Sequence, residues 1–258
     1  MTVAVVTGAA QRLGRAMALE LARRGYDVAV HYSGSADAAA DAVAQARGFG
    51  VNAQAFQADL LDADATARLI PDIAAQMGPV AVLVNNASIF EYDNIHTATP
   101  DSWDRHIGSN LRAPFQLSQA MAAQAPRAVL DENGEPQAQA LIVNMVDQRV
   151  LKPTPEFMTY SLAKAGLWAL TRTLAQALAP DIRVNAIGPG PTMIGARQSQ
   201  AHFDAQRAAT ILGRGADAAG ITQALGYFLD ARAVTGQLIC VDGGQHLAWR
   251  TPDVLGRE

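Results

Sequence analysis

Short apolar runs alternate along the chain with longer segments in which apolar residues recur at helical spacing. Most runs are apolar throughout, which is typical of strands covered on both faces. The longer segments are rich in alanine, and several end at a glycine, as helices commonly do. This alternation predicts a Rossmann-type, doubly wound α/β fold, with one parallel sheet of about seven strands and helices on both faces. The expected strands are 3–6, 27–31, 51–57, 80–85, 140–145, 182–187 and 238–241, and the expected helices are 13–24, 36–47, 64–77, 100–125, 160–179 and 216–229.

Two segments interrupt this rhythm. Residues 126–139 contain a polar cluster with Asn133-Gly134 at its centre, which predicts a surface excursion before the next strand. Residues 191–215 follow a Gly-Pro-Gly-Pro turn and have no strand pattern, so we expect a flexible flap there over the site.

Composition narrows the class of protein. A chain of 258 residues, half of them hydrophobic, can bury one large core, and we expect a single domain over 1–258. The net charge of −4 and the scattered basic residues argue against a nucleic-acid or membrane partner. The single cysteine, Cys240, lies in an apolar stretch and is expected in the core, and neither a disulfide nor a metal site is expected. The chain has no targeting pattern and no apolar run of about 18 residues, which favours a cytoplasmic location.

A turn of small residues, Thr7 to Ala16, directly follows the first strand and opens a helix. Unpaired backbone amides and the helix dipole at such a point receive a pyrophosphate well, and glycine lets the phosphate approach the main chain. A glycine-rich turn can also be a plain strand-to-helix connection. Its place in the first βα unit favours a dinucleotide site.

The end of the second strand indicates which nicotinamide cofactor is used. An NAD-dependent chain usually has an acidic residue here to bind the ribose hydroxyls. This strand is followed by Ser33, Gly34 and Ser35, and no carboxylate occurs before Asp37. The sequence therefore favours NADPH over NADH.

Tyr160 and Lys164 lie four residues apart, so on a helix both side chains share one face. A phenol with a pKa of about 10 needs a nearby positive charge to act as an acid or base at neutral pH, and Lys164 can supply it. An isolated pair at this spacing is most often an ordinary surface pair. The dinucleotide turn upstream favours the catalytic interpretation.

These motifs resemble those of the short-chain dehydrogenase/reductase family, and the resemblance spans residues 2–247. Arg12 stands where the middle glycine of the turn is usual, and Ser88 where Asn-Asn-Ala is usually followed by glycine. The resemblance makes Asn110 the residue that holds a proton-relay water, Tyr160 the proton donor and Lys164 its partner. It implies cofactor contacts from Gly8, Arg12, Leu13, Gly14, His31, Tyr32, Ser33, Ser35, Asp59, Leu60, Asn86, Ala87, Tyr160, Lys164, Pro189, Gly190 and Thr192.

Asp147, thirteen residues before Tyr160, occupies the position of the family's serine. A carboxylate beside a ketone oxygen would oppose the negative charge that develops there, whereas an Asp–Tyr pair can pass a proton to a ring nitrogen. Taken alone, Asp147 could equally be a helix cap or a loop carboxylate.

The sequence around Asp147, together with Arg12, His31-Tyr32 and Asn86-Ala87-Ser88-x-Phe90, resembles the pteridine reductase branch of the family. By that resemblance Phe90 stacks on the substrate ring, and Ser88 and Arg12 form hydrogen bonds with it. Asp147 and Tyr160 then lie at its reacting edge. Without the resemblance, Phe90 is expected in the core.

Three hypotheses follow. The first is an NADPH-dependent reductase of a pteridine or a similar C=N substrate. The second is a reductase of 3-oxoacyl thioesters or other ketones, which the missing serine disfavours. The third is a non-catalytic, cofactor-sensing protein, against which the Tyr160 and Lys164 pair argues. The resemblance also implies a homo-oligomer, most commonly a tetramer.

Overall fold

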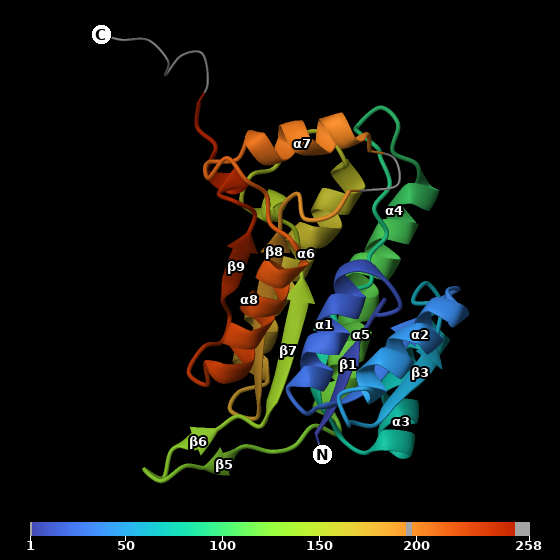
Figure 1. Ribbon diagram of the computed structural model, residues 1–258, viewed down its shortest axis with the longest axis vertical. Coiled ribbons are helices and arrows are strands. Elements are labelled where there is room, and N and C mark those ends of the chain that lie inside the picture. Colours follow the sequence, from blue (N-terminus) through green and yellow to red (C-terminus); the bar gives the residue numbers. More distant parts are fainter. Residues whose placement is uncertain (1, 195–197, 251–258) are drawn as a thin grey trace.

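One sheet of seven parallel strands forms the centre of the molecule (Figure 1). The computed structural model describes residues 2–194 and 198–250. The strand order is β3-β2-β1-β4-β7-β8-β9, and it reverses direction between β1 and β4, where doubly wound sheets bind ligands. The predicted fold class is confirmed. The strands are β1 (Val3–Val6), β2 (Asp27–Tyr32), β3 (Ala53–Gln57), β4 (Val80–Asn85), β7 (Ala140–Met145), β8 (Ile182–Pro189) and β9 (Leu238–Val241).

Helices cover both faces of the sheet and create two apolar cores. On one face α1, α2 and α8 bury side chains such as Met17, Val43 and Phe228 against the strands, and on the other face α3 and α5 bury Ile70 and Leu117. Strands covered on both sides must be apolar throughout, which is why β1, β4 and β7 are entirely buried. The helices are α1 (Arg12–Arg23), α2 (Ala36–Arg47), α3 (Ala63–Met77), α4 (Pro100–Ile107), α5 (Ala113–Ala122), α6 (Met158–Ala177), α7 (Gln200–Ala208) and α8 (Ala218–Asp230).

The helix expected over 100–125 is not continuous. A π-helical turn, Gly108–Arg112, separates α4 from α5, and α5 ends at Ala122. A π-turn inserts one residue into the helical repeat and rotates the side chains around it, which hydrophobic periodicity does not reveal. The expectation of one long helix was therefore wrong.

The two interrupting segments contain regular structure of their own. Residues 126–139 include a small antiparallel hairpin of β5 (Val129–Leu130) and β6 (Pro136–Gln137), which projects from the lower edge of the molecule in Figure 1. Residues 191–215 include α7, which lies across the opposite end. Residues 195–197 of the expected flap lie outside the described residues.

Cys240 differs from its expected environment. It lies on β9, the edge strand of the sheet, and is only partly buried, because an edge strand lacks a neighbour on one side. Among the described residues, no helix is long and apolar enough to cross a membrane.

Candidate active site

Asp147 and Tyr160 meet beyond the carboxyl end of β7. The hydroxyl group of Tyr160, on the first turn of α6, donates a hydrogen bond to Oδ2 of Asp147 at 3.0 Å. The other carboxylate oxygen of Asp147 accepts from the backbone amide of Arg149 at 2.8 Å and caps the short 3-10 helix Gln148–Val150. The carboxylate is thus both a cap and a partner of the phenol, so the two interpretations of Asp147 coexist.

The environment keeps the Tyr160 hydroxyl protonated. Burial raises the pKa of Tyr160 well above its ordinary value, and the charge and hydrogen bond of Asp147 raise it further. Arg149 acts in the opposite direction. A phenol in this state can donate a proton and cannot readily serve as a base.

Lys164 lies one turn further along α6 and does not contact the Tyr160 hydroxyl. Its Nζ donates to the backbone carbonyl of Met145 at 2.7 Å and lies 5.7 Å from the centre of the Tyr160 ring. Burial lowers the pKa of Lys164 to about 8, although the charge of Asp147 opposes that shift. The expectation that Lys164 lowers the pKa of Tyr160 is not met in this arrangement, because burial and Asp147 dominate.

The π-turn positions Asn110 beneath the same site. Its side chain is fully buried and forms two hydrogen bonds with Ile89, accepting from the backbone amide at 2.9 Å and donating to the carbonyl at 2.8 Å. Asn110 therefore fixes the backbone immediately before Phe90.

Phe90 belongs to an aromatic cluster at the mouth of the site. Its side chain is 46% exposed, so the expectation of a core position, made without the resemblance, was wrong. Its ring stacks on Phe157 with 4.4 Å between centroids and meets the Tyr160 ring edge-on at 4.7 Å. The guanidinium carbon of Arg149 lies 5.0 Å from the centre of the Phe157 ring. These contacts leave a flat, partly exposed aromatic surface beside the reactive hydroxyl.

Two of these residues escaped the sequence analysis. Phe157 holds a left-handed backbone conformation, with φ of 56°, at the start of α6. Nη1 of the Arg149 guanidinium group lies 3.5 Å from Oδ2 of Asp147. A sequence contains no sign of such backbone geometry, although an arginine two residues after a functional carboxylate could have been noticed.

A buried polar network joins the Phe90 loop to the start of α6. Nε2 of His106, on α4, accepts from the backbone amide of Glu91 at 3.1 Å, so Nδ1 carries the ring proton and donates to Oγ1 of Thr159 at 2.7 Å. Thr159 in turn donates to the carboxylate of Asp93, which also accepts from Ser102. Because Thr159 precedes Tyr160, this network fixes the reactive residue relative to the aromatic surface. Sequence analysis did not identify it, since its members have no spacing in common.

The glycine-rich turn has the geometry expected of a phosphate site. Gly8 has a φ of 62°, and a Cβ at Gly14 would overlap the carbonyl oxygen of Gly8. No side chain caps the start of α1, so its first amides remain available to a ligand. Thr7 accepts from the amides of Asn86 and Ala87 at 2.8 and 2.9 Å and holds the turn against the end of β4.

His31 lies beneath this turn and not on its ligand-facing side. Its Nδ1 accepts from the backbone amide of Gly8 at 3.0 Å, and Nε2 lies 3.1 Å from the carbonyl of Ala58. Burial lowers the pKa of His31 to about 4, so the ring is neutral. Both ring nitrogens are engaged, which makes His31 a support for the turn and removes it from the expected cofactor contacts.

Arg12 connects the turn to the segment after β8. It has a φ of 53°, and its guanidinium group donates to the backbone carbonyls of Ile194 at 2.8 Å and Met193 at 3.1 Å. We expected this side chain to contact the cofactor and the substrate. It instead bonds to the first part of the segment 191–215, where a flap was expected.

The remaining predicted contacts surround the same edge of the sheet. Tyr32, Ser33 and Ser35 lie at the end of β2, and the start of α2 has no side-chain cap. The side chain of Leu60 is buried in the core, which leaves only its backbone for a cofactor, whereas Asp59 is exposed. The other partly or fully exposed positions are Leu13, Ser88, Pro189, Gly190 and Thr192.

Three potential metal ligands lie at the end of β9, with ligand atoms within 4.8 Å of one another: Cys240 on the strand, and Asp242 and His246 just after it. The imidazole of His246 lies 2.7 Å from the Asp242 carboxylate. Burial raises the pKa of the Cys240 thiol to about 12, whereas a metal binds a thiolate. The Asp242 carboxylate also accepts from the backbone amides of Gly244 at 2.9 Å and His246 at 2.8 Å, so it holds the loop after β9.

Comparison with known proteins agrees with this fold. Residues 2–204 match the family described as short chain dehydrogenase, and the chain therefore belongs to that family and is an oxidoreductase.

Individual relatives include the 3-oxoacyl-[acyl-carrier-protein] reductase FabG of Staphylococcus epidermidis, 33% identical over 95% of this chain and 98% of the relative. Among solved structures, FolM alternative dihydrofolate reductase 1 from Brucella suis, in complex with NADP, is 41% identical with a TM-score of 0.89, covering 98% of this chain and 97% of the other. A short chain dehydrogenase from Burkholderia cenocepacia, also with NADP, is 30% identical with a TM-score of 0.86, covering 95% and 97%.

Proposed function

We propose that this protein is an NADPH-dependent reductase of a pteridine, a dihydropterin or dihydrofolate-like C=N compound, with Tyr160 as the proton donor. The hydrogen bond between the Tyr160 hydroxyl and the Asp147 carboxylate is the observation that carries the proposal. A carboxylate at this point would repel the alkoxide formed from a ketone, but it suits a ring nitrogen that gains a proton. Similarity to the two Brucella proteins named as alternative dihydrofolate reductases, at 40–41% identity, supports the same substrate class.

The residues present fit a dinucleotide phosphate. The uncapped start of α1 beside Gly8 and Gly14 suits the pyrophosphate. The uncapped start of α2, with the hydroxyl groups of Ser33 and Ser35 beside it, suits a 2′-phosphate. NADPH bound there supplies a hydride. The relatives solved with NADP support the choice of this cofactor over NADH.

Each side chain then has a defined role. Phe90 offers one face to a flat heteroaromatic ring and orients it. Ser88 forms hydrogen bonds with the ring, as does Arg12 once its guanidinium group leaves the carbonyls of Met193 and Ile194. The single proton of the Tyr160 hydroxyl, which is hydrogen-bonded to Asp147, passes to the ring nitrogen, and Asp147 holds the hydroxyl in place before the transfer. Asn110 and Lys164 hold the backbone on either side of the reacting groups.

A second candidate is reduction of a 3-oxoacyl thioester, which the FabG relatives favour at 32–33% identity. Asp147 in place of the family's serine is the objection to it. We also propose a homo-oligomer, tetrameric as in many relatives, which light scattering on the purified protein would test.

One experiment separates the candidates. The purified protein would be tested for oxidation of NADPH and of NADH with dihydrobiopterin, dihydromonapterin, dihydrofolate and an acetoacetyl thioester. We expect turnover of at least one pterin with NADPH. Turnover of the thioester alone would overturn the pteridine proposal, and no turnover with any substrate would favour a non-catalytic protein.

A further inference from the structure

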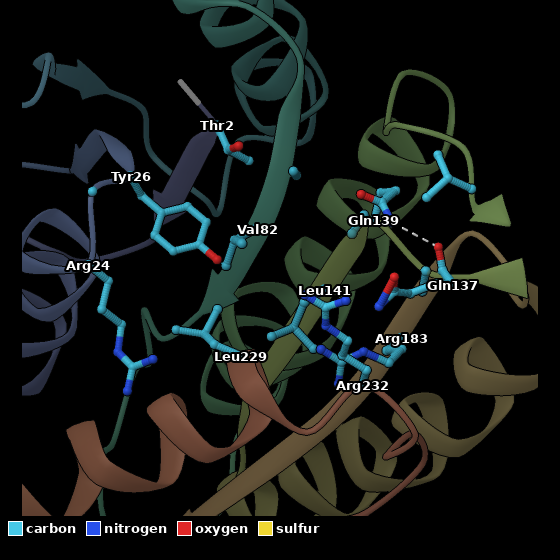
Figure 2. A pocket seen from close by; sticks show the side chains of 15 residues that line it. Thr2, Arg24, Tyr26, Val82, Gln137, Gln139, Leu141, Arg183, Leu229 and Arg232 are labelled. Atoms are coloured by element: carbon cyan, nitrogen blue, oxygen red, sulfur yellow. Dashed lines mark hydrogen bonds between the residues drawn. The ribbon is translucent and has the colours of Figure 1, made fainter. Parts of the chain in front are cut away.

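One cavity of the protein lies away from the active site. It has a volume of about 410 Å³ and opens at the amino ends of the strands, the edge opposite Asp147 and Tyr160. One wall comes from the hairpin segment, at Gln137 and Gln139, and the other from the end of α1 and the residues after α8 (Figure 2). Nothing in the proposed reaction uses this edge.

The charge of the lining is one-sided. Three arginines, Arg24, Arg183 and Arg232, line the cavity, and no described aspartate or glutamate lines it. Arg24 forms salt bridges with Glu20 at 2.7 Å and Asp230 at 3.0 Å, neither of which lines the cavity. In a protein with a net charge of −4, a cavity whose charged lining residues are all arginines is a local concentration of positive charge.

Arg183 is held rigidly in the wall. It is 8% exposed, and its guanidinium group donates to the backbone carbonyls of Phe228 at 2.7 Å, Ala231 at 3.0 Å and Val234 at 3.0 Å, so it caps the end of α8. Besides burial, the nearby charge of Arg232 lowers the pKa of Arg183. Arg232 lines the same cavity beside this buried cation (Figure 2), an arrangement that an anion between them would relieve.

Arg232 and Tyr26 have unused hydrogen-bonding capacity. Within the described chain, Arg232 has no ion pair or hydrogen bond, and the Tyr26 hydroxyl has no hydrogen-bond partner. Burial raises the pKa of Tyr26, so its hydroxyl remains a neutral donor. Figure 2 shows Tyr26 on one side of the cavity and the two arginines on the other, with Leu141 and Val82 between them.

We infer that this cavity is a binding site for a small organic anion, a carboxylate or phosphate ester with an apolar body. The guanidinium groups of Arg183 and Arg232 and the hydroxyl of Tyr26 would bind the oxyanion, because fixed donors around a charged acceptor make the stronger hydrogen bonds. Val82, Leu141 and Leu229 would contact the apolar part. The volume accommodates one ring or a short chain.

The test uses two isosteric probes, benzoate and neutral benzamide, with phenyl phosphate and inorganic phosphate as further arms. NADP⁺ at saturating concentration occupies the cofactor site, so that its phosphate-binding turn does not capture the probes. Binding would be followed by calorimetry and by the amide chemical shifts of the hairpin, residues 129–139. We expect benzoate to bind at least about tenfold more tightly than benzamide, since only the anion engages the guanidinium groups. The relative affinity of phenyl phosphate then distinguishes a phosphate ester from a carboxylate, and inorganic phosphate measures what the apolar walls add.

Two variants identify the site. Arg232→Gln and Tyr26→Phe should each weaken benzoate binding about fivefold or more. Arg68→Gln, which removes the same charge from an exposed position on α3, should leave it unchanged. Arg183 is not substituted because it caps α8. Equal affinity for benzoate and benzamide, or an unaltered benzoate affinity in Arg232→Gln, would overturn the inference whatever the enzyme reduces.

Discussion

At the residue scale, the proposed chemistry depends on one side chain, Asp147. Asp147 lies where a serine would hydrogen-bond a carbonyl oxygen, and it accepts the hydrogen bond of Tyr160 at 3.0 Å. The carboxylate adds to burial in raising the pKa of the Tyr160 hydroxyl, which favours proton donation over proton removal. The Tyr160 hydroxyl is therefore held in its protonated form, which is the form that the proposed reduction requires.

Replacing Asp147 tests this directly. Asp147→Ser should lower kcat for pterin reduction by about 100-fold or more, because the positioned acid loses its partner. The dissociation constant for NADP⁺ should remain unchanged, since Asp147 lies away from the phosphate-binding turn. Asp147→Asn is the matched variant, since it retains an acceptor oxygen without the charge. Its activity should fall between those of the parent protein and Asp147→Ser. Full pterin activity in Asp147→Ser would disprove the role.

His31 makes a second prediction at this scale, concerning stability. Burial lowers its pKa from 6.5 to about 4 in the folded state. Between these pH values the unfolded chain binds a proton that the folded chain does not, so stability falls as the pH drops through this window. The full effect is on the order of 3 kcal/mol.

His31→Gln removes that titration. From pH 7 to pH 5 the variant should lose about 2 kcal/mol less unfolding free energy than the parent protein, as measured by urea denaturation. It should be less stable than the parent at pH 7, because the amide of Gly8 loses a well-placed acceptor. Burial also lowers the pKa of His106. Because His106 is present in both proteins, it contributes equally to the pH dependence of their unfolding free energies. If the unfolding free energies of the variant and the parent protein fell equally between pH 7 and pH 5, the prediction would be contradicted.

Spacing, together with the family resemblance, singled out Tyr160, Lys164 and Asp147 in the sequence. What it could not supply was the environment of each group. The direction of the Tyr160 pKa shift and the place of His31 beneath the turn both depend on burial. Burial is set by residues distant in the chain, such as Ala58 beside His31, and no local pattern encodes it.

At the scale of elements, the site depends on how α4 and α6 are joined. Hydrophobic periodicity predicted the strands and most helices within a few residues, because covered strands and amphipathic helices have distinct repeats. It merged α4 and α5, because the extra residue of the π-turn leaves the apolar pattern almost unchanged. That turn is what places Asn110 against Ile89.

The His106 network is the testable link between these elements. His106→Leu leaves the amide of Glu91 and the hydroxyl of Thr159 without their partner. Unfolding free energy should fall by about 2 kcal/mol, because two buried polar groups lose hydrogen bonds.

The kinetic result distinguishes positioning from general destabilisation. We expect kcat for pterin reduction to fall about tenfold at a temperature where the variant is fully folded, since Phe90 and Tyr160 lose their fixed relation. KM for NADPH should stay the same. His96→Leu, at an exposed position in the same region, is the control and should behave as the parent protein. An unchanged kcat in His106→Leu would show that the network only stabilises the fold.

At the scale of the whole molecule, Arg12 connects the start of α1 to two residues that lie 181 and 182 positions further along the chain. Its guanidinium group donates to the carbonyls of Met193 and Ile194, and the same group is the one proposed to form hydrogen bonds with the substrate. A bound ligand and the segment before α7 therefore compete for one side chain. The order of that segment should depend on Arg12 when no ligand is bound.

Hydrogen–deuterium exchange can measure this dependence in the protein without cofactor. In Arg12→Ala, amides of α7 should exchange about fivefold faster than in the parent protein, because two exposed, charge-assisted hydrogen bonds contribute about 1 kcal/mol. Amides of α8, which packs on α1 and not on Arg12, should be unaffected. Arg15→Ala is the matched control, since Arg15 lies on α1 and bonds to Gln45 instead. If α7 exchanges at the same rate in Arg12→Ala, other contacts hold the segment in place, and the competition between ligand and flap does not operate.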